Sequence, residues 1–171
     1  MAKLTKLSEH FTLDEFTRSD VASRKRIINI PTDLEINTLK HTCEYLAEPL
    51  RANLSKVFGK DIYIVITSGF RCLKLNRALG SKDNSQHVKG EAFDFYCFYL
   101  FKGRKINIPY NQVYEAIKKL FKDKIISVDQ CIEENSGGST WVHVSYSAWG
   151  KTKNRGEFLK YNGKTYVKDK V

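Results

Sequence analysis

The spacing of apolar residues in the first third of the chain predicts helices. Two Thr-x-x-Glu capping boxes, at residues 12–15 and 32–35, mark helix starts, because the two side chains of each box bond backbone N–H groups that the first turn leaves free. After the second box, apolar residues recur every three or four positions, which indicates one long amphipathic helix that Gly59 ends. The stripe consists of Ile36, Leu39, Cys43, Leu46, Leu50, Leu54 and Val57.

Beyond residue 60 the pattern changes to that of strands. Residues 61–67 are rich in β-branched and aromatic side chains, which is typical of a buried strand. Further expected elements are strands at 91–98, 127–132 and 140–146, a helix at 110–121, and a hairpin at 158–167. A Gly-rich turn at 135–139 joins the third and fourth strands, so we expect these strands to pair antiparallel.

Residues 71–90 are polar and have no clear period, which indicates a long loop inside the domain. Such loops are usually functional or disordered. The 171 residues and the 42% apolar content fit one globular domain over 1–171, with a core from about residue 7 to 160 and a basic hairpin or tail at 151–171. The chain has neither an apolar run long enough for a membrane helix nor the start of a secretory signal. We therefore expect synthesis in the cytoplasm without a signal peptide and no membrane insertion.

Charge and cysteine content narrow the class of protein. Lys and Arg number 29 against 19 acids, and the resulting net charge of +10 attracts polyanions such as nucleic acid, anionic cell-wall polymers or membrane surfaces. No nucleic-acid-binding motif is present, so we do not expect a nucleic-acid partner. The four cysteines are scattered without a Cys-x-x-Cys pair, which predicts reduced and mostly buried thiols. They are Cys43, Cys72, Cys97 and Cys131.

Two histidines and an aspartate form a candidate zinc site. His87 precedes Asp94 by seven residues, and His143 lies in the strand expected at 140–146. Two imidazoles and a carboxylate suit a catalytic zinc ion, which keeps its fourth position for water. Alternation along the strands turns Asp94 and His143 away from their apolar neighbours. His10 and His41 are interpreted as ordinary surface or hydrogen-bonded residues.

Several motifs around these residues resemble those of the zinc D-alanyl-D-alanine carboxypeptidases. They are Ser68-Gly69-Phe70-Arg71, Leu75-Asn76-Arg77, Ser85-x-His87 with Gly90, Ala92 and Asp94, Asp129 to Glu134, and Trp141 to Ser145. Matches run from Leu7 to about Leu159, and the bacterial and phage cell-wall-cutting branch is most similar. The resemblance implies a small α+β domain with a central antiparallel sheet and flanking helices, shared with the Hedgehog signalling domain.

The resemblance also implies roles for individual residues. His87, Asp94 and His143 match the ligands of one zinc ion per chain, and Arg71 matches an arginine that polarises the substrate carbonyl or holds a carboxylate. Many relatives place an acid three residues before the last histidine, where this chain has Thr140. In the most similar subgroup the general base instead falls on Glu134, with the adjacent Glu133 in reserve.

Three further residues are candidates for substrate binding. Ser85 and Gln86 either bind the substrate backbone, orient a zinc ligand, or form ordinary loop hydrogen bonds. Trp141 shares its strand face with His143, which would place it in the cleft.

The implied function is hydrolysis of peptidoglycan stem peptides by a monomeric zinc peptidase. The resemblance leaves open a D-Ala-D-Ala carboxypeptidase and an endopeptidase for the L-Ala to D-Glu bond. It suggests a phage endolysin released through a holin, or a virion-associated lysin, whose positive charge favours anionic wall polymers. The alternative is a non-catalytic Hedgehog-like zinc domain that binds the wall or a protein. An acid close to the zinc site would distinguish catalysis from binding.

Overall fold

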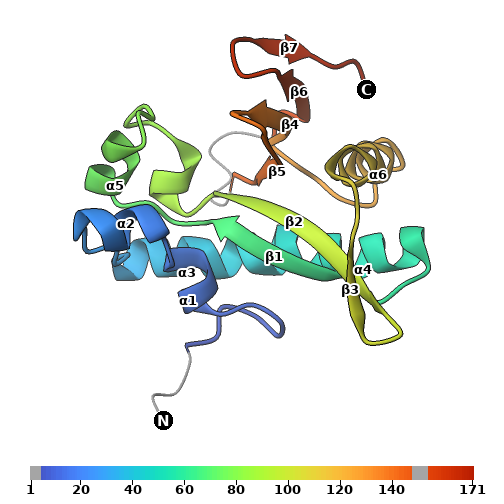
Figure 1. Cartoon of the computed structure of the whole chain (residues 1–171), viewed down its shortest axis with the longest axis horizontal. Helices are drawn as coiled ribbons and strands as arrows, with labels where there is room; N and C mark the ends of the chain where they lie inside the picture. The colour runs from blue at the N-terminus through green and yellow to red at the C-terminus, as the bar shows by residue number, and fades with distance from the viewer. Residues whose placement is uncertain (1–4, 148–153) are drawn as a thin grey trace.

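Seven strands form one mixed sheet in the computed structural model, which describes residues 5–147 and 154–171. The strands are β1 (Tyr63–Ser68), β2 (Ala92–Phe101), β3 (Arg104–Asn107), β4 (Gln130–Ser136), β5 (Ser139–Ser145), β6 (Glu157–Tyr161) and β7 (Tyr166–Lys168). Their order is β1-β2-β5-β4-β6-β7, and β3 pairs with β2 alone (Figure 1). All pairs are antiparallel except β4 with β6. The expected single α+β domain is therefore confirmed, with one parallel pair added.

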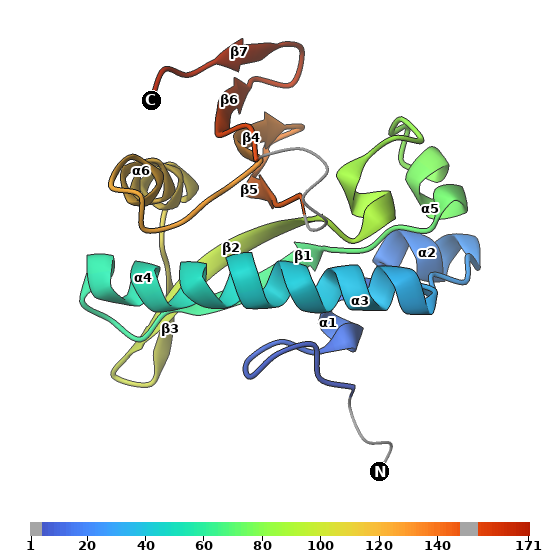
Figure 2. The ribbon, with the colours of Figure 1, turned by 180° about the vertical axis from the view of Figure 1, so that it is seen from behind.

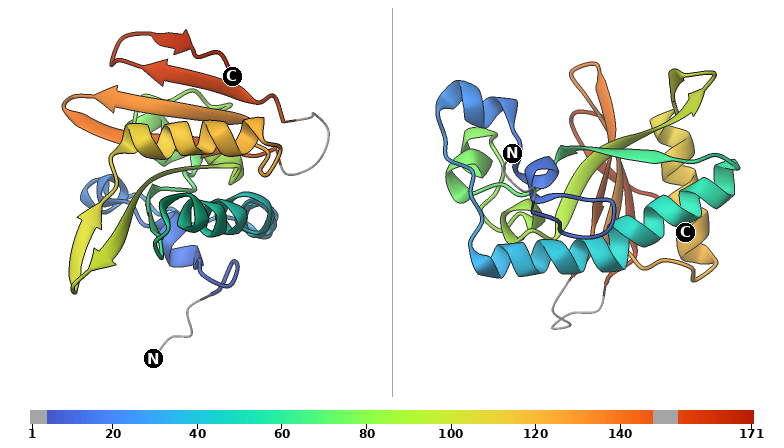
Figure 3. Two further views of the ribbon diagram at one scale, coloured as in Figure 1. Left: turned by 90° about the vertical axis from the view of Figure 1, so that its right-hand side faces the viewer. Right: turned by 90° about the horizontal axis from the view of Figure 1, so that it is seen from below.

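Helices flank this sheet. They are α1 (Leu13–Thr17), α2 (Asp20–Lys25), α3 (Asp33–Thr42), α4 (Glu48–Phe58), α5 (Leu73–Ala78) and α6 (Tyr110–Lys122), with a π-helical turn η1 (Cys43–Ala47) and a 3-10 turn η2 (Gln86–Lys89). α3, η1 and α4 form one continuous rod beside β1 and β2 (Figure 2), as the apolar stripe predicts. α6 packs across β4, β5 and β2 (Figure 3). None of the helices in the described part of the chain has the length and apolar character that a membrane crossing requires.

Local sequence signals explain where α1 begins and where the long helix of α3, η1 and α4 begins and ends. Both capping boxes are formed, with the Glu15 and Glu35 carboxylates accepting hydrogen bonds from the backbone N–H of Thr12 and Thr32. Gly59 ends α4 in the left-handed conformation, at φ 61°. The π turn ends two residues before Pro49, whose missing N–H interrupts the helical hydrogen-bond pattern.

The structure corrects several sequence expectations. Residues 71–90 contain α5 and η2 rather than one long loop, and α2 and β3 are additional elements. α5 is only six residues long, too short for apolar residues to repeat at helical spacing. Val57, expected on the buried stripe, is 47% exposed, and the third strand begins at Gln130 rather than at 127.

The two faces of the sheet differ in character. One face carries fully buried apolar side chains, among them Phe93 and Phe95 of β2 and Val144 of β5, which join the core beneath the helices. The opposite face carries Asp94 and His143, as period-two alternation requires. The same core buries Cys43, Cys97 and Cys131, as expected, whereas Cys72 is only partly buried. The sheet therefore presents a polar face on a rigid support.

Candidate metal centre

Three structural elements bring His87, Asp94 and His143 together. β2 and β5 are neighbours, and their register places Asp94 directly beside His143. His87 comes from η2, and the left-handed Gly90, at φ 74°, turns the chain from η2 into β2. A Cβ atom on Gly90 would lie 3.0 Å from the Leu39 side chain, so the glycine also permits close packing on α3.

The ligating atoms of the three side chains converge. Oδ1 of Asp94 lies 3.4 Å from Nε2 of His87 and 2.8 Å from Nδ1 of His143. All three ligating atoms lie within 4.8 Å of one another. Two atoms bound to one tetrahedral zinc ion are roughly 3.3 Å apart, so small adjustments suffice to bind the ion. All three residues are buried: His87 is 4% exposed, Asp94 7% and His143 8%.

Hydrogen bonds from surrounding groups fix the orientation of these side chains. Nδ1 of His87 donates to the carbonyl of Gly69 at 2.8 Å, which leaves the Nε2 lone pair directed at Asp94. The second oxygen of Asp94 accepts a hydrogen bond from Nη2 of Arg71 at 2.8 Å, and Nε of Arg71 donates to Ser68. Such outer partners hold metal ligands in place and set the histidine tautomer.

The electrostatics of the triad suit a cation. Burial lowers the pKa of His87, which favours the neutral imidazole that a metal requires. Burial alone would raise the pKa of Asp94, but the adjacent His87 and His143 hold it well below its usual range, so the carboxylate stays ionised. A neutral nitrogen donor and an ionised oxygen donor, beside a second imidazole, form a donor set that fits zinc.

Gly69 is required by close packing, and its substitution gives a testable result. A Cβ atom there would lie 2.5 Å from the carbonyl oxygen of Phe16, a backbone atom that cannot rotate away. We expect Gly69→Ala to lower the free energy of unfolding by about 1–3 kcal/mol. It should also weaken zinc binding about tenfold or more, because the carbonyl that orients His87 must shift. Denaturant unfolding of the zinc-free protein and competition titration with a chelator measure the two effects.

Gly103→Ala provides the matched control for this substitution. Gly103 has φ 73°, and a Cβ atom there would have no neighbour within 4 Å, so the change introduces backbone strain without a clash. It should leave zinc affinity unchanged. Zinc affinity of Gly69→Ala equal to that of the wild type would contradict the positioning role of the Gly69 carbonyl.

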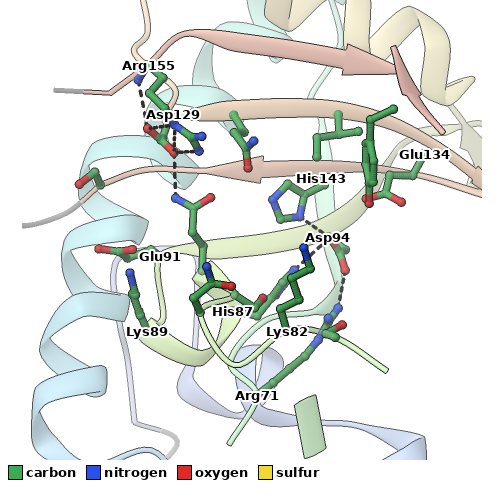
Figure 4. A pocket seen from close by; sticks show the side chains of 18 of the residues that line it. Arg71, Lys82, His87, Lys89, Glu91, Asp94, Asp129, Glu134, His143 and Arg155 are labelled. Atoms are coloured by element: carbon green, nitrogen blue, oxygen red, sulfur yellow. Dashed lines mark hydrogen bonds and ion pairs between the residues drawn. The ribbon is translucent and has the colours of Figure 1, made fainter. Parts of the chain in front are cut away.

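A cleft of about 1460 Å³ opens over the triad (Figure 4). Apart from the reserve candidate Glu133, every residue that the sequence analysis placed in the site lines this cleft: Arg71, Ser85, Gln86, His87, Asp94, Glu134, Trp141 and His143. They come from five separate stretches of the chain. The cleft therefore combines the candidate metal ligands with an acid, a guanidinium group and an aromatic ring.

Strand register separates the two candidate glutamates. Glu134 lies opposite Trp141 and two residues from Ile132, which pairs with His143, so Glu134 faces the cleft. Glu133 points to the other face, where an oxygen of its carboxylate lies 3.4 Å from the Lys160 ammonium. Burial, aided by the negative charge of Asp94, raises the pKa of Glu134 above the ordinary carboxyl value.

Sequence reasoning missed several residues of the cleft. Lys82, Tyr166 and Arg155 line it, and the last two belong to the segment predicted as a basic hairpin or tail, which the sequence did not connect with the site. Tyr166 stacks on Tyr161 across the β6–β7 hairpin. The Asn162-Gly163 turn predicts that hairpin, but no local signal indicates that β6 pairs with β4 and so brings Tyr166 to the site.

Gln86 takes part in a network at one end of the cleft. Its side-chain amide donates to Asp129 at 3.0 Å, and Asp129, only 4% exposed, also accepts hydrogen bonds from the Arg155 guanidinium and backbone N–H. Because Gln86 directly precedes His87, this network braces the turn that carries a candidate ligand. Of the three interpretations of Gln86, the geometry favours orientation of a ligand.

Removing Arg155 should destabilise the protein in a pH-dependent way. We expect Arg155→Met to lower the free energy of unfolding by about 1–3 kcal/mol at pH 7, because Asp129 remains buried without its cation. Burial raises the pKa of Asp129, but hydrogen bonds from Arg155 outweigh it and lower that pKa below its usual value. This stabilisation exists above the unfolded pKa of about 3.9 and is lost as the pH falls through the folded value. Urea unfolding should therefore show the wild type and the variant converging below about pH 4.

Arg77→Met is the control, since Arg77 pairs with an exposed aspartate, Asp83. Its effect on the free energy of unfolding should be small, because both side chains of this pair are exposed to solvent. A difference between wild type and Arg155→Met that stays constant down to pH 2 would contradict the assigned role of Asp129.

The two remaining histidines lie outside the triad, as expected. His10 bonds the Glu48 carboxylate at 2.7 Å, and the His41 ring stacks on Tyr45 with a centroid separation of 4.3 Å.

Comparison with known proteins identifies one match. The family model described as Peptidase M15 matches residues 9–106, which is more than half of the chain. The matched segment includes His87 and Asp94, and the β2–β5 pairing then adds His143. Searches of curated proteins and of solved structures gave no significant match.

Proposed function

Since the chain belongs to the Peptidase M15 family of zinc metallopeptidases, we propose that it hydrolyses peptidoglycan stem peptides. The observation that supports this proposal is the convergence of a buried His-Asp-His triad and Glu134 on one cleft. A zinc site used only for structure or binding would need no acid beside it. The cleft therefore favours catalysis over the non-catalytic Hedgehog-like alternative.

In the proposed reaction, His87, Asp94 and His143 would hold the zinc ion. A bound zinc ion supplies Lewis-acid polarisation of a carbonyl and lowers the pKa of water. Glu134 accepts a proton from the attacking water molecule as the C–O bond forms, and then donates it to the amine as the peptide C–N bond breaks. The raised pKa of Glu134 suits both transfers, because a base with a pKa closer to neutrality also serves as an acid.

Arg71 would stabilise the oxygen of the scissile carbonyl. Its Nη2 is bonded to Asp94 and its Nε to Ser68, so the guanidinium plane is fixed. The Nη1 amino group forms no hydrogen bond within the described residues and is available to the negative charge that develops on the carbonyl oxygen. A donor fixed in advance is effective because it does not reorganise during the reaction.

Membership of a peptidase family supports a peptide substrate, and within the proposed stem peptide two bonds are candidates. They are the terminal D-Ala-D-Ala bond and the L-Ala to D-Glu bond near the start of the stem. In either case Trp141 and Ser85, on the cleft wall, would contact the peptide.

Digestion of purified peptidoglycan tests the proposal. We expect release of new amino termini, and mass spectra of the soluble products identify the bond, either through free D-Ala or through stems that begin at D-Glu. A protein that holds zinc but releases nothing from walls of several chemotypes would contradict catalysis and favour the binding domain.

We further propose that the protein acts at the bacterial wall, as a phage endolysin after holin-type release or as part of a virion. The net charge of +10 supports this, because it favours association with anionic wall polymers. We propose that the unit of activity is the monomer, since one chain provides all residues of the cleft.

A further inference from the structure

We infer that Lys82 forms a binding subsite for a carboxylate group of the peptide substrate, an inference that rests on the proposed function. Lys82 lies between α5 and η2 and lines the same cleft as the metal triad. In Figure 4 its side chain points from this loop toward Asp94. The sequence motifs of the site do not include it.

The backbone of the Lys82 loop is held in place by the interior. Asn76 is fully buried, and its side-chain amide donates to the carbonyls of Ser81 at 3.3 Å and Lys82 at 2.8 Å. The Lys82 carbonyl also accepts a hydrogen bond from the backbone N–H of Ser85 at 3.0 Å. An ion pair between Arg77 and Asp83 closes the outer side of the loop. The backbone position from which the Lys82 side chain extends is therefore fixed.

Both arginines that line the cleft are already paired. Arg71 binds Asp94, and Arg155 binds Asp129 and Glu157. The Lys82 ammonium has no acidic partner among the described residues, and it lies on the side of the cleft that carries the ligands. An unpaired, positioned cation beside a peptide-binding site favours a peptide with a carboxylate near the scissile bond.

Pairing of Arg71 strengthens this assignment. The family arginine is a candidate for binding a substrate carboxylate, but here Arg71 has two of its three nitrogens committed to Asp94 and Ser68. The guanidinium charge of Arg71 is therefore already balanced by the Asp94 carboxylate, which lies 2.8 Å from Nη2. Lys82 supplies a positive charge that is not yet paired, while Nη1 of Arg71 would face the scissile carbonyl.

The stem peptide offers this carboxylate from two sources: the C-terminal D-Ala and the α-carboxylate of the γ-linked D-Glu. Three pentapeptides distinguish them: L-Ala-γ-D-Glu-L-Lys-D-Ala-D-Ala, its analogue with an amide on the D-Glu α-carbon, and its analogue with a C-terminal amide. Their binding to the zinc-loaded Glu134→Gln protein is measured by calorimetry, so that no hydrolysis occurs.

We expect one of the two amide analogues to bind about tenfold more weakly than the free peptide, because it loses an ion pair, and an ion pair in a partly solvated cleft contributes about that factor to binding. Adding Lys82→Met should weaken binding of the free peptide about tenfold and leave the affinity of the weaker-binding amide analogue unchanged. Lys82→Arg should retain most of the preference, and higher ionic strength should reduce it. Lys89→Met is the matched control, because Lys89 lines the same cleft but lies beside Glu91 (Figure 4).

The inference is overturned if Lys82→Met weakens all three peptides equally, changes none of them, or if none of the three binds. Failure of the proposed function has a different signature. In that case the wild type would leave the free peptide intact while the binding preference still depends on Lys82.

Discussion

Replacing His143 by alanine is expected to remove zinc and to lower kcat/KM by at least about 10³-fold. The substitution deletes one of three converging ligands and leaves two, His87 of η2 and Asp94 of β2. Loss of the ion removes a charge stabilisation of several kcal/mol, and each 1.36 kcal/mol corresponds to a tenfold change in rate. Metal analysis by atomic emission and release of amino termini from peptidoglycan measure both effects.

His10→Ala is the control for this experiment, because His10 lies outside the cleft and bonds Glu48. It should keep both zinc and activity. Circular dichroism of both variants separates loss of metal from loss of fold. A folded His143→Ala protein with wild-type zinc content would contradict the ligand assignment.

Glu134→Gln is expected to lower kcat by about 10²–10⁴-fold while zinc remains bound. The amide keeps the shape of the side chain but cannot accept the proton of the attacking water molecule. Activity of the wild type should fall as the pH decreases through the pKa of Glu134, because only the ionised carboxylate is a base. Rates on the stem pentapeptide between pH 5 and pH 8, with metal content determined in parallel, test this.

Glu133→Gln is the matched control, one residue earlier on the same strand. Its side chain faces Lys160 on the opposite side of the sheet, so kcat should change by no more than about twofold. Equal losses in the two variants would contradict the assignment of Glu134 as the base, and a larger loss in Glu133→Gln would reverse it.

Much of the fold is encoded in local patterns. The capping boxes at Thr12 and Thr32 and the left-handed Gly59 mark helix ends through hydrogen bonds and backbone sterics, and both operate within a few residues. Alternation likewise places Asp94 and His143 on one face of the sheet. Short elements such as α5 and β3 have too few residues for a period to develop.

Residue type and strand parity predict the candidate metal ligands. They do not predict the site residues whose position depends on pairing between distant strands. His87 and Asp94 form a motif, and His143 has the right parity on its strand. Parity alone does not separate Glu134 from Glu133. Both lie beyond the end of the strand predicted at 127–132, and alternation can be extended to them only if the strand continues regularly, as β4 does. The register between β4 and β5 separates them. Arg155 reaches the cleft through the parallel β4–β6 pair, a contact of distant segments that no local pattern specifies.

Restoring zinc to the chelated enzyme tests the central claim most directly. The protein is stripped of metal, zinc is added back in fractions of an equivalent, and hydrolysis of the stem pentapeptide is measured at each point. The triad at His87, Asp94 and His143 predicts an inactive apoprotein, a linear return of activity, and saturation at one zinc per chain. An apoprotein that remains active, or one that binds zinc without any gain in hydrolysis, would contradict the account.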